Sequence, residues 1–274
     1  MYFSLPVISF TAIRNNHDFA LNSVRKACET TGMFRLTEHG LESQSENFLK
    51  NMKAYFSQPL EQKKLLERNE KNPWGYFDSE LTKNKRDWKE IFDLVATSSN
   101  DVFESEMRWP ETPKLFKEIN LDWHKKNRDI AITLLGKISL ILGGPEEELT
   151  KFFTKEDTSF LRLNHYPVCN HPAKSHRDFT GDGHLGIYDH TDAGALTILA
   201  QSETPGLQIR EDSHWKTVPS KEEELIVNTG DLLQIWSNDQ FPAPVHRVLA
   251  NDKFDRYSAA FFLNPKYETD VVPL

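Results

Sequence analysis

Two histidines and one aspartate in the second half of the chain have the residue types and spacing of a catalytic metal site. His190 and Asp192 are two residues apart, so on an extended segment their side chains leave from the same face. His246 lies on a later segment, which antiparallel pairing would bring alongside. Two imidazoles and one carboxylate can hold one face of an octahedral Fe(II) and leave positions open for a bidentate cosubstrate and dioxygen. The set therefore predicts a catalytic iron site, because a closed structural site would leave no open position.

A second pattern, ten residues after His246, predicts a pocket for a carboxylate. Arg256, Ser258, Ala260, Phe262 and Asn264 alternate along one expected strand and so point to the same side. Arginine offers a planar fork of donors to a carboxylate, and serine adds a hydroxyl donor beside it. This pair suits the far carboxylate of 2-oxoglutarate, whose near carboxylate and keto oxygen would chelate the iron. A buried arginine without such an anion would be left unpaired at high cost.

A third pattern lies just before Pro167, where Arg162, Asn164 and Tyr166 alternate on one face. Asn164 and Tyr166 are candidate hydrogen-bond donors to the cosubstrate. Taken alone, the same pattern also fits an ordinary strand with a polar outward face, and that interpretation stays open here.

Composition narrows the class of protein. Lys and Arg total 33 against 41 Asp and Glu in 274 residues, a net charge of -8, so the overall field repels polyanions and argues against nucleic acid as a partner. Cys28 and Cys169 are too few for a disulfide framework and are interpreted as reduced thiols. No segment has the length and apolarity needed to span a membrane. We expect a soluble cytoplasmic protein with a small-molecule substrate and no obligate protein partner.

Hydrophobic periodicity predicts a mainly helical first half and a strand-rich second half. After position 158 the period becomes two, and eight short strands with turns between them indicate a double-sheet jelly roll. We expect one domain over 1–274, with a mainly helical region over 1–157 and the jelly-roll core over 158–266. The expected early elements are strands near 3–10, 33–37 and 88–95, and helices over about 21–32, 43–57, 57–70, 113–142 and from 145. The expected later strands cover 159–166, 184–190, 194–200, 206–210, 225–229, 231–236, 245–249 and 256–263.

Together these residues resemble the plant-type 2-oxoglutarate and Fe(II)-dependent dioxygenases, the superfamily that includes isopenicillin N synthase, and the resemblance covers nearly the whole chain. The second half carries the family's "N-Y-Y-P", "P-G-L-Q" and Arg-x-Ser patterns. The first half has its "G-F-F-x-x-x-N-H-G" and "D-W-K-E" segments. The matching residues are Leu5-Pro6-Val7-Ile8, Gly32-Met33-Phe34, Glu38-His39-Gly40, Asp87-Trp88-Lys89-Glu90, Leu163-Asn164-His165-Tyr166-Pro167, Pro205-Gly206-Leu207-Gln208, Asn228-Thr229-Gly230-Asp231 and Ser237-Asn238.

The resemblance implies a distorted double-stranded β-helix, or jelly roll, with an N-terminal helical region. It implies that His190, Asp192 and His246 bind Fe(II), and that cosubstrate contacts come from the positions matching the family's pattern, which are Arg256, Ser258, Tyr166 and Asn164. The implied activity couples oxidative decarboxylation of 2-oxoglutarate, to succinate and CO2, with C–H oxidation of a small organic molecule by O2. Hydroxylation, desaturation and oxidative cyclisation all stay open, as does the pathway of biosynthesis.

Two alternatives remain at this point. One is an oxidase of the same fold that does not use 2-oxoglutarate, in which Arg256 and Ser258 would bind the substrate's own carboxylate. The other is a non-catalytic metal- or ligand-binding protein that retains the site. Asn164 and Tyr166 argue against the first, and the unbroken set of metal ligands argues against the second.

The chain departs from the family's pattern in two places. The connection over 168–186 is longer than usual and is expected to form a loop over the site. The family's C-terminal helix does not follow Leu274, so the pocket is expected to be more open or to be closed by another element. Aromatic and polar residues near the predicted pocket are candidates for substrate contacts. These candidates are Phe77, Phe92, Tyr188, Phe262 and Asn264.

Overall fold

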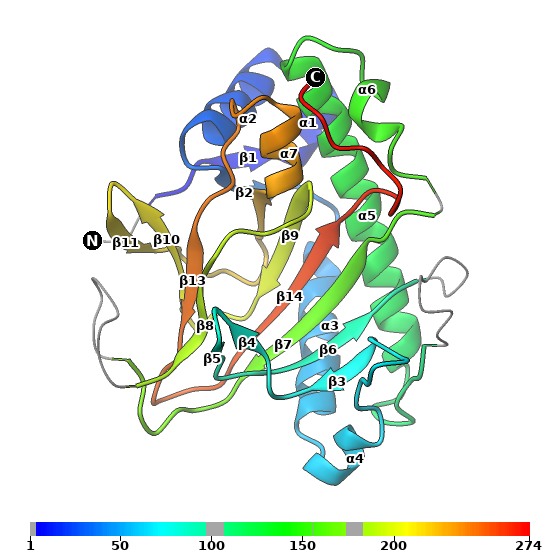
Figure 1. The fold of residues 1–274 in the computed structure, drawn as a ribbon, viewed down its shortest axis with the longest axis vertical. Coiled ribbons are helices and arrows are strands. Elements are labelled where there is room, and N and C mark those ends of the chain that lie inside the picture. The colour runs from blue at the N-terminus through cyan, green and yellow to red at the C-terminus, as the bar shows by residue number, and fades with distance from the viewer. Residues whose placement is uncertain (1–3, 97–106, 155, 174–182) are drawn as a thin grey trace.

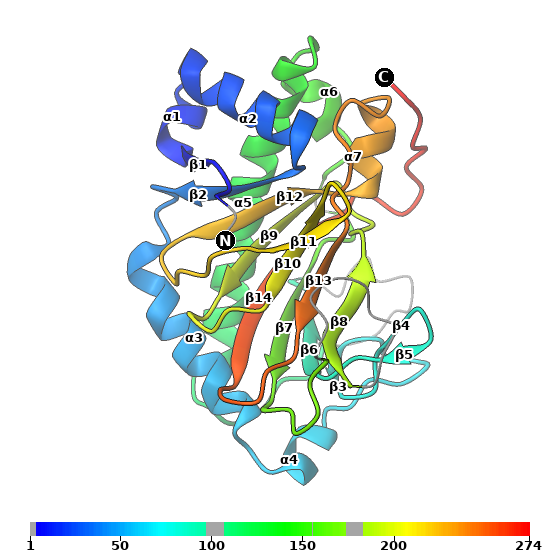
Figure 2. The ribbon, with the colours of Figure 1, turned by 90° about the vertical axis from the view of Figure 1, so that its left-hand side faces the viewer.

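Two β-sheets face each other in the computed structural model, which describes residues 4–96, 107–154, 156–173 and 183–274 (Figures 1 and 2). The large sheet has eight strands in the order β1-β2-β12-β9-β14-β7-β6-β3, and the small sheet has four in the order β11-β10-β13-β8. The large sheet comprises β1 (Val7–Ser9), β2 (Met33–Thr37), β3 (Gly75–Phe77), β6 (Glu90–Leu94), β7 (Phe160–Tyr166), β9 (Leu196–Gln201), β12 (Leu225–Thr229) and β14 (Arg256–Leu263). The small sheet comprises β8 (Leu185–His190), β10 (Leu207–Glu211), β11 (His214–Thr217) and β13 (His246–Leu249).

Helices cover the face of the large sheet that points away from the small sheet. The longest helix, α5 (Phe116–Ile141), contacts β9 and β14, and α3 (Glu42–Phe56) contacts β7 and β14 (Figure 2). A separate hairpin of β4 (Leu81–Thr82) and β5 (Lys85–Arg86) lies against β8. The remaining helices are α1 (Phe10–Arg14), α2 (Asp18–Thr30), α4 (Leu60–Lys64), α6 (Glu147–Thr150) and α7 (Asp231–Trp236).

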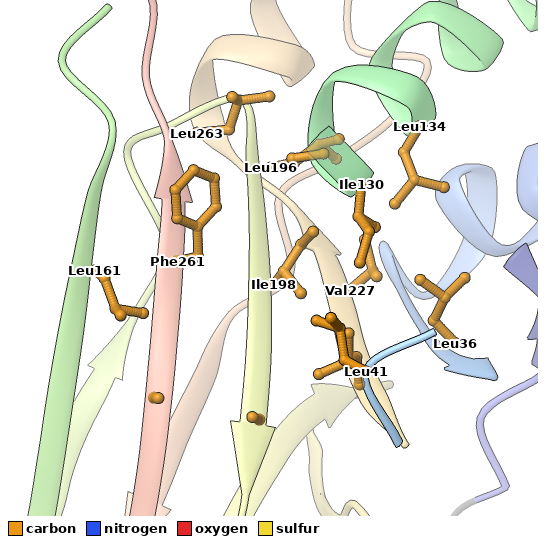
Figure 3. Close-up of a cluster of buried hydrophobic side chains, with 14 of the residues drawn as sticks. Leu36, Leu41, Ile130, Leu134, Leu161, Leu196, Ile198, Val227, Phe261 and Leu263 are labelled. Atoms are coloured by element: carbon orange, nitrogen blue, oxygen red, sulfur yellow. The ribbon is translucent and has the colours of Figure 1, made fainter. Parts of the chain in front are cut away.

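The main hydrophobic core fills the space between the large sheet and its helices. Figure 3 shows Ile130 and Leu134 of α5 in the same cluster of buried side chains as Ile198 of β9 and Phe261 of β14. Because side chains alternate along a strand, residues next to these core positions must point to the opposite face, between the two sheets. Within the same strands, that alternation separates the apolar core on one face from the cavity between the sheets on the other.

The double-sheet architecture with helices in the N-terminal half confirms the predicted fold class. The first 94 residues also contribute β1, β2, β3 and β6 to the large sheet, so the helical region and the jelly roll share one sheet. Seven of the eight predicted strands after position 158 are present as β7, β8, β9, β10, β12, β13 and β14.

Two predictions of local structure were wrong, and one strand of the small sheet was missed. Residues 231–236 form helix α7 and not a strand, because Gly230 ends β12 in an extended conformation and Asp231 sits in the first helical turn. Strand β11 was missed, since it is short, three of its four residues are polar and none is buried. The charged helix predicted up to position 70 is only the short α4. Of the long connection over 168–186, residues 174–182 lie outside the described residues, so the expected loop over the site is not described.

Within the described ranges, no helix combines the length and apolarity required to cross a membrane.

Candidate active site

One group of metal-ligating side chains stands out among the described residues, and it is the predicted set His190, Asp192 and His246. One ligand atom from each residue lies within 4.8 Å of the others. The Nε2 atoms of both histidines are 3.6 Å from Oδ1 of Asp192, and their rings are 4.3 Å apart between centroids. His190 ends β8 and His246 begins β13, and the two residues are direct partners in the antiparallel ladder.

Hydrogen bonds on the outer side of these three residues direct one atom of each toward a common point. Nδ1 of His190 is 2.8 Å from the carbonyl oxygen of Tyr188, and Nδ1 of His246 is 3.0 Å from that of Pro244. An Nδ1–H that donates to a carbonyl leaves Nε2 as the free lone pair, which is the tautomer a metal requires. The set therefore fits Fe(II) in its donor types and in its outer hydrogen bonds.

The carboxylate of Asp192 is held in the same way by two strands of the large sheet. Its Oδ2 accepts a 2.6 Å hydrogen bond from Thr197 Oγ1 on β9 and a 2.9 Å bond from Asn228 Nδ2 on β12. Its Oδ1 faces the two histidines. Sequence reasoning did not assign Thr197 or Asn228 to the site, although a polar residue inside an otherwise apolar strand was a usable signal.

Burial and neighbouring charges set the protonation states of His190 and Asp192. Burial, together with the neighbouring His246, lowers the pKa of His190 to about 4, so its imidazole is neutral near pH 7. Burial alone would raise the pKa of Asp192, but His246, His190 and the hydrogen bonds from Thr197 and Asn228 outweigh it and lower that pKa. Neutral imidazoles and an ionised carboxylate are the states that bind a metal.

A β-bulge in β8 decides which of its side chains reach the cavity. His246 pairs with His190, but two residues further along β13 Val248 pairs with Ile187, so β8 carries one extra residue. The extra residue puts His190 and Ile187 on the cavity side and turns Tyr188 away. The ring of Tyr188 instead lies 5.2 Å from Nζ of Lys85, under the β4–β5 hairpin.

Arg256 is a buried cation at the opposite end of the same cavity. Arg256 is only 1% exposed. Its Nη1 lies 3.3 Å from Oγ of Ser258, and its Nη2 donates a 2.9 Å hydrogen bond to Oε1 of Gln201. Its guanidinium carbon is 4.9 Å from the centre of the Tyr166 ring, and its Nε has no partner. Burial lowers the pKa of Arg256. Within the described ranges, none of its hydrogen-bond partners is a carboxylate, so the site fits an external one.

Tyr166 and Asn164 lie on β7 beside these groups, and both line the cavity. Asn164 pairs with Ser258 and Tyr166 with Arg256 in the ladder between β7 and β14. The buried Oδ1 of Asn164 has no partner. Two glycines make room here, since a Cβ at Gly186 would lie 2.8 Å from the Tyr166 ring and one at Gly206 would lie 2.9 Å from Cδ of Arg256.

The remaining wall of the cavity is partly charged and partly apolar. The cavity spans about 710 Å³, including the part at its mouth that is open to solvent. Charged residues come from β7 and from the positions just before β6 and β4. The charged lining residues are Glu80, Lys89 and Arg162, and the apolar ones include Ile187, Leu199, Leu207, Val248, Ala260 and Phe262.

Of the five candidate substrate residues, only Phe262 lines the cavity. The prediction that Phe92 covers the site was wrong, because its ring is fully buried in the core, 5.0 Å from the Tyr55 ring. Phe77 lies under the guanidinium of Arg68 at 3.9 Å and is not among the lining residues. Tyr188 is turned away by the bulge. Asn264 follows the last residue of β14, and its Nδ2 lies 3.4 Å from the carbonyl oxygen of Thr158.

Known proteins resemble this chain over almost its whole length. The family model of the 2OG-Fe(II) oxygenase superfamily matches residues 158–265, and the model described as "non-haem dioxygenase in morphine synthesis N-terminal" matches residues 5–112. A relative from Ocimum basilicum, oxoglutarate-dependent flavonoid 7-O-demethylase 1, is 32% identical over 275 residues, which cover 98% of this chain and 71% of that protein. Gibberellin 3-beta-dioxygenase 3 of Arabidopsis thaliana is 33% identical, with 98% and 77% covered.

Solved structures agree with the family models. The crystal structure of JOX2 in complex with 2OG, Fe and JA superposes with a TM-score of 0.85 at 27% identity, over 98% of this chain and 77% of that one. The chain therefore belongs to the 2OG-Fe(II) oxygenase superfamily and is a 2-oxoglutarate- and Fe(II)-dependent dioxygenase that oxidises small molecules.

Proposed function

We propose that His190, Asp192 and His246 bind the Fe(II) of this dioxygenase. The observation that carries the proposal is the convergence of two Nε2 atoms and one carboxylate oxygen, while the other polar atom of each side chain is already engaged by the protein. Three protein ligands on one face leave the rest of an octahedron for 2-oxoglutarate and O2.

We further propose that Arg256 and Ser258 bind the far carboxylate of 2-oxoglutarate, with Tyr166 and Asn164 beside it. A fully buried guanidinium without an anionic partner among the described residues is costly unless a ligand supplies the anion. Gln201 fixes one side of the guanidinium, and Ser258 offers its hydroxyl on the other. The apolar side chains of Leu199, Leu207 and Val248 would exclude water along the carbon chain of the cosubstrate.

Iron and 2-oxoglutarate, when bound with O2, supply an oxidant that removes hydrogen from a C–H bond, and the protein contributes positioning. The substrate would be oriented by the residues that line the cavity beyond the iron ligands, away from Arg256. We propose that its position there decides among hydroxylation, desaturation and oxidative cyclisation.

We propose that the chain forms one domain over 1–274, since strands from both halves share the large sheet. A cytoplasmic location remains a prediction, which the free and buried state of Cys28 and Cys169 supports. That nucleic acid is not a partner also remains a prediction from the net charge of -8.

The test is an anaerobic titration of Fe(II) and then 2-oxoglutarate into metal-free protein, followed by the visible metal-to-ligand charge-transfer band. We expect the wild type and the control Arg14→Ala, an exposed arginine on α1, to give the band. Arg256→Ala should bind iron but require about 100-fold more 2-oxoglutarate. His246→Ala should give no band. Wild-type affinity for 2-oxoglutarate in Arg256→Ala would contradict the cosubstrate site. A charge-transfer band in His246→Ala would contradict the iron site.

A further inference from the structure

The half of the cavity left for the substrate carries a charged cluster that the metal and cosubstrate sites do not use. Oε2 of Glu80 accepts a 2.8 Å hydrogen bond from Nη1 of Arg162 and lies 3.2 Å from Nζ of Lys89. All three residues line the cavity. Lys89 is also close enough to the site to contribute, as a minor cause, to the lowered pKa of His190.

Each cation of this cluster has a second carboxylate behind it, so the cluster is balanced in charge. Arg162 donates from Nε and Nη2 to both oxygens of Asp93, at 2.8 Å each. Nζ of Lys89 lies 3.7 Å from Asp87. Arg68 approaches Glu80 at 2.9 Å and Asp93 at 3.4 Å. The cluster therefore joins three cations, Arg68, Lys89 and Arg162, to three carboxylates, Glu80, Asp87 and Asp93.

Glu80 is ionised over the whole physiological range of pH. Burial would raise the pKa of its carboxyl, but the surrounding Arg162, Lys89 and Arg68 outweigh burial and lower it to about 2. Without Glu80, the wall would present two cations to a substrate. With Glu80, a fixed negative charge already occupies the position where a substrate carboxylate would meet both of them.

We propose that the substrate is an uncharged molecule with an apolar body and a hydrogen-bonding oxygen, and that Glu80 selects it against a carboxylate. This inference rests on the proposed function of the cavity. A substrate carboxylate would have to displace Glu80 or lie beside it, and two like charges in contact are strongly unfavourable. A neutral oxygen meets no such repulsion.

The donors and walls of the cavity fit such a molecule. A guanidinium carries five N–H groups and an ammonium three, and the carboxylates of the cluster take three of those on Arg162. Because Arg162 and Lys89 both line the cavity, we expect them to donate to a hydroxyl or carbonyl oxygen of the substrate. Beside them, Ile187, Ala260 and Phe262 give the cavity an apolar side, which suits the apolar body of a small molecule.

The variant that isolates this role is Glu80→Gln. It removes the charge and keeps the shape, and both cations keep a carboxylate, Arg162 through Asp93 and Lys89 through Asp87. The fold should therefore survive. The matched control is Glu70→Gln, the same change at an exposed position ten residues earlier.

The experiment measures binding of matched probe pairs to protein loaded anaerobically with Fe(II) and saturating 2-oxoglutarate, by calorimetry. The pairs are 3-phenylpropanamide with 3-phenylpropanoate and 3-cyclohexylpropanamide with 3-cyclohexylpropanoate. In the wild type and in Glu70→Gln, each amide should bind more tightly than its acid. In Glu80→Gln the ratio of the affinity for the acid to the affinity for its amide should rise by about tenfold or more. The added change Lys89→Met should reverse most of that rise.

Tighter binding of both acids than of their amides in the wild type would overturn the inference. So would an unchanged ratio in Glu80→Gln. The charge-transfer band is recorded in every sample, because its failure to form contradicts the proposed function, whereas a normal band with preference for the acids contradicts only the selection by Glu80.

Discussion

Thr197 and Asp192 are joined by a 2.6 Å hydrogen bond from Oγ1 of the threonine to Oδ2 of the carboxylate. Both residues are buried, and Asn228 donates to the same oxygen. The pair fixes which carboxylate oxygen faces the two histidines. Outer hydrogen bonds of this kind orient metal ligands and tune their affinity.

Thr197→Val should weaken Fe(II) binding by about 10- to 100-fold, because Asp192 loses one of the two donors that orient it. The measurement is a competitive titration of Fe(II) against a chromophoric chelator without oxygen. Thr197→Ser keeps the hydroxyl and should retain most of the affinity. Equal affinities in Thr197→Val and the wild type would show that Asn228 alone orients the carboxylate.

Gln201→Met should weaken 2-oxoglutarate binding by about tenfold, since Oε1 of Gln201 accepts from Nη2 of Arg256 and holds the guanidinium in place. The charge-transfer band measured against 2-oxoglutarate concentration gives the affinity. Gln208→Met is the control, because Gln208 is equally buried but binds Arg247 and Thr217 in the small sheet. A loss of affinity in the control alone would contradict the assignment of Gln201.

Gly206→Ala should also weaken 2-oxoglutarate binding, by displacing the side chain of Arg256. A Cβ at this position would lie 2.9 Å from Cδ and 3.2 Å from Nε of Arg256. Gly40→Ala, where a Cβ meets nothing within 4 Å but φ is +81°, controls for the general cost of adding a methyl group. Reduced affinity with normal iron binding is the expected result, and normal cosubstrate affinity would contradict the close contact.

Glu80 should stabilise the metal-free fold above about pH 4.5, and this contribution should disappear as the pH falls toward 2. The sign follows from the pKa of its carboxyl, which the neighbouring cations lower to about 2 from an ordinary value of 4.5. Urea unfolding of the wild type and Glu80→Gln at about pH 6 and about pH 3 tests this. The variant should lose less stability on acidification than the wild type or Glu70→Gln, and parallel losses would contradict the prediction.

Leu134→Ala should lower the free energy of unfolding by about 2–5 kcal/mol, because the side chain is fully buried between α5 and the large sheet (Figure 3). Leu140→Ala, on the same helix but 38% exposed, should change it by less than about 1 kcal/mol. Urea unfolding with an unchanged m-value is the measurement. A small effect of Leu134→Ala would mean that α5 adjusts to fill the cavity.

The grouping of His190, Asp192 and His246 could be predicted from sequence because it depends on short-range rules. Asp192 follows His190, the last residue of β8, by only two positions, and pairing of β8 with β13 places His190 opposite His246. The alternation of Arg162, Asn164 and Tyr166 likewise places all three in the cavity.

The other parts of the site and fold could not be predicted, because they depend on features that the periodicity of apolar residues does not record. One extra residue in β8 reverses the face of Tyr188, and a strict alternation cannot detect a bulge. The six residues 231–236 are too few and too apolar for their period to distinguish a strand from helix α7. Glu80 reaches the cavity from a segment between strands, so only the tertiary structure brings it to Arg162 and Lys89.

The hydrogen bonds of Asp192 have a mechanical consequence for the whole molecule. The two histidines belong to the small sheet, whereas the donors that hold Asp192 belong to the large sheet. An ion bound by all three residues would link the two sheets, and moving the sheets apart would strain its coordination. Binding of the metal and the distance between the two sheets are therefore coupled, so a change in one should change the other.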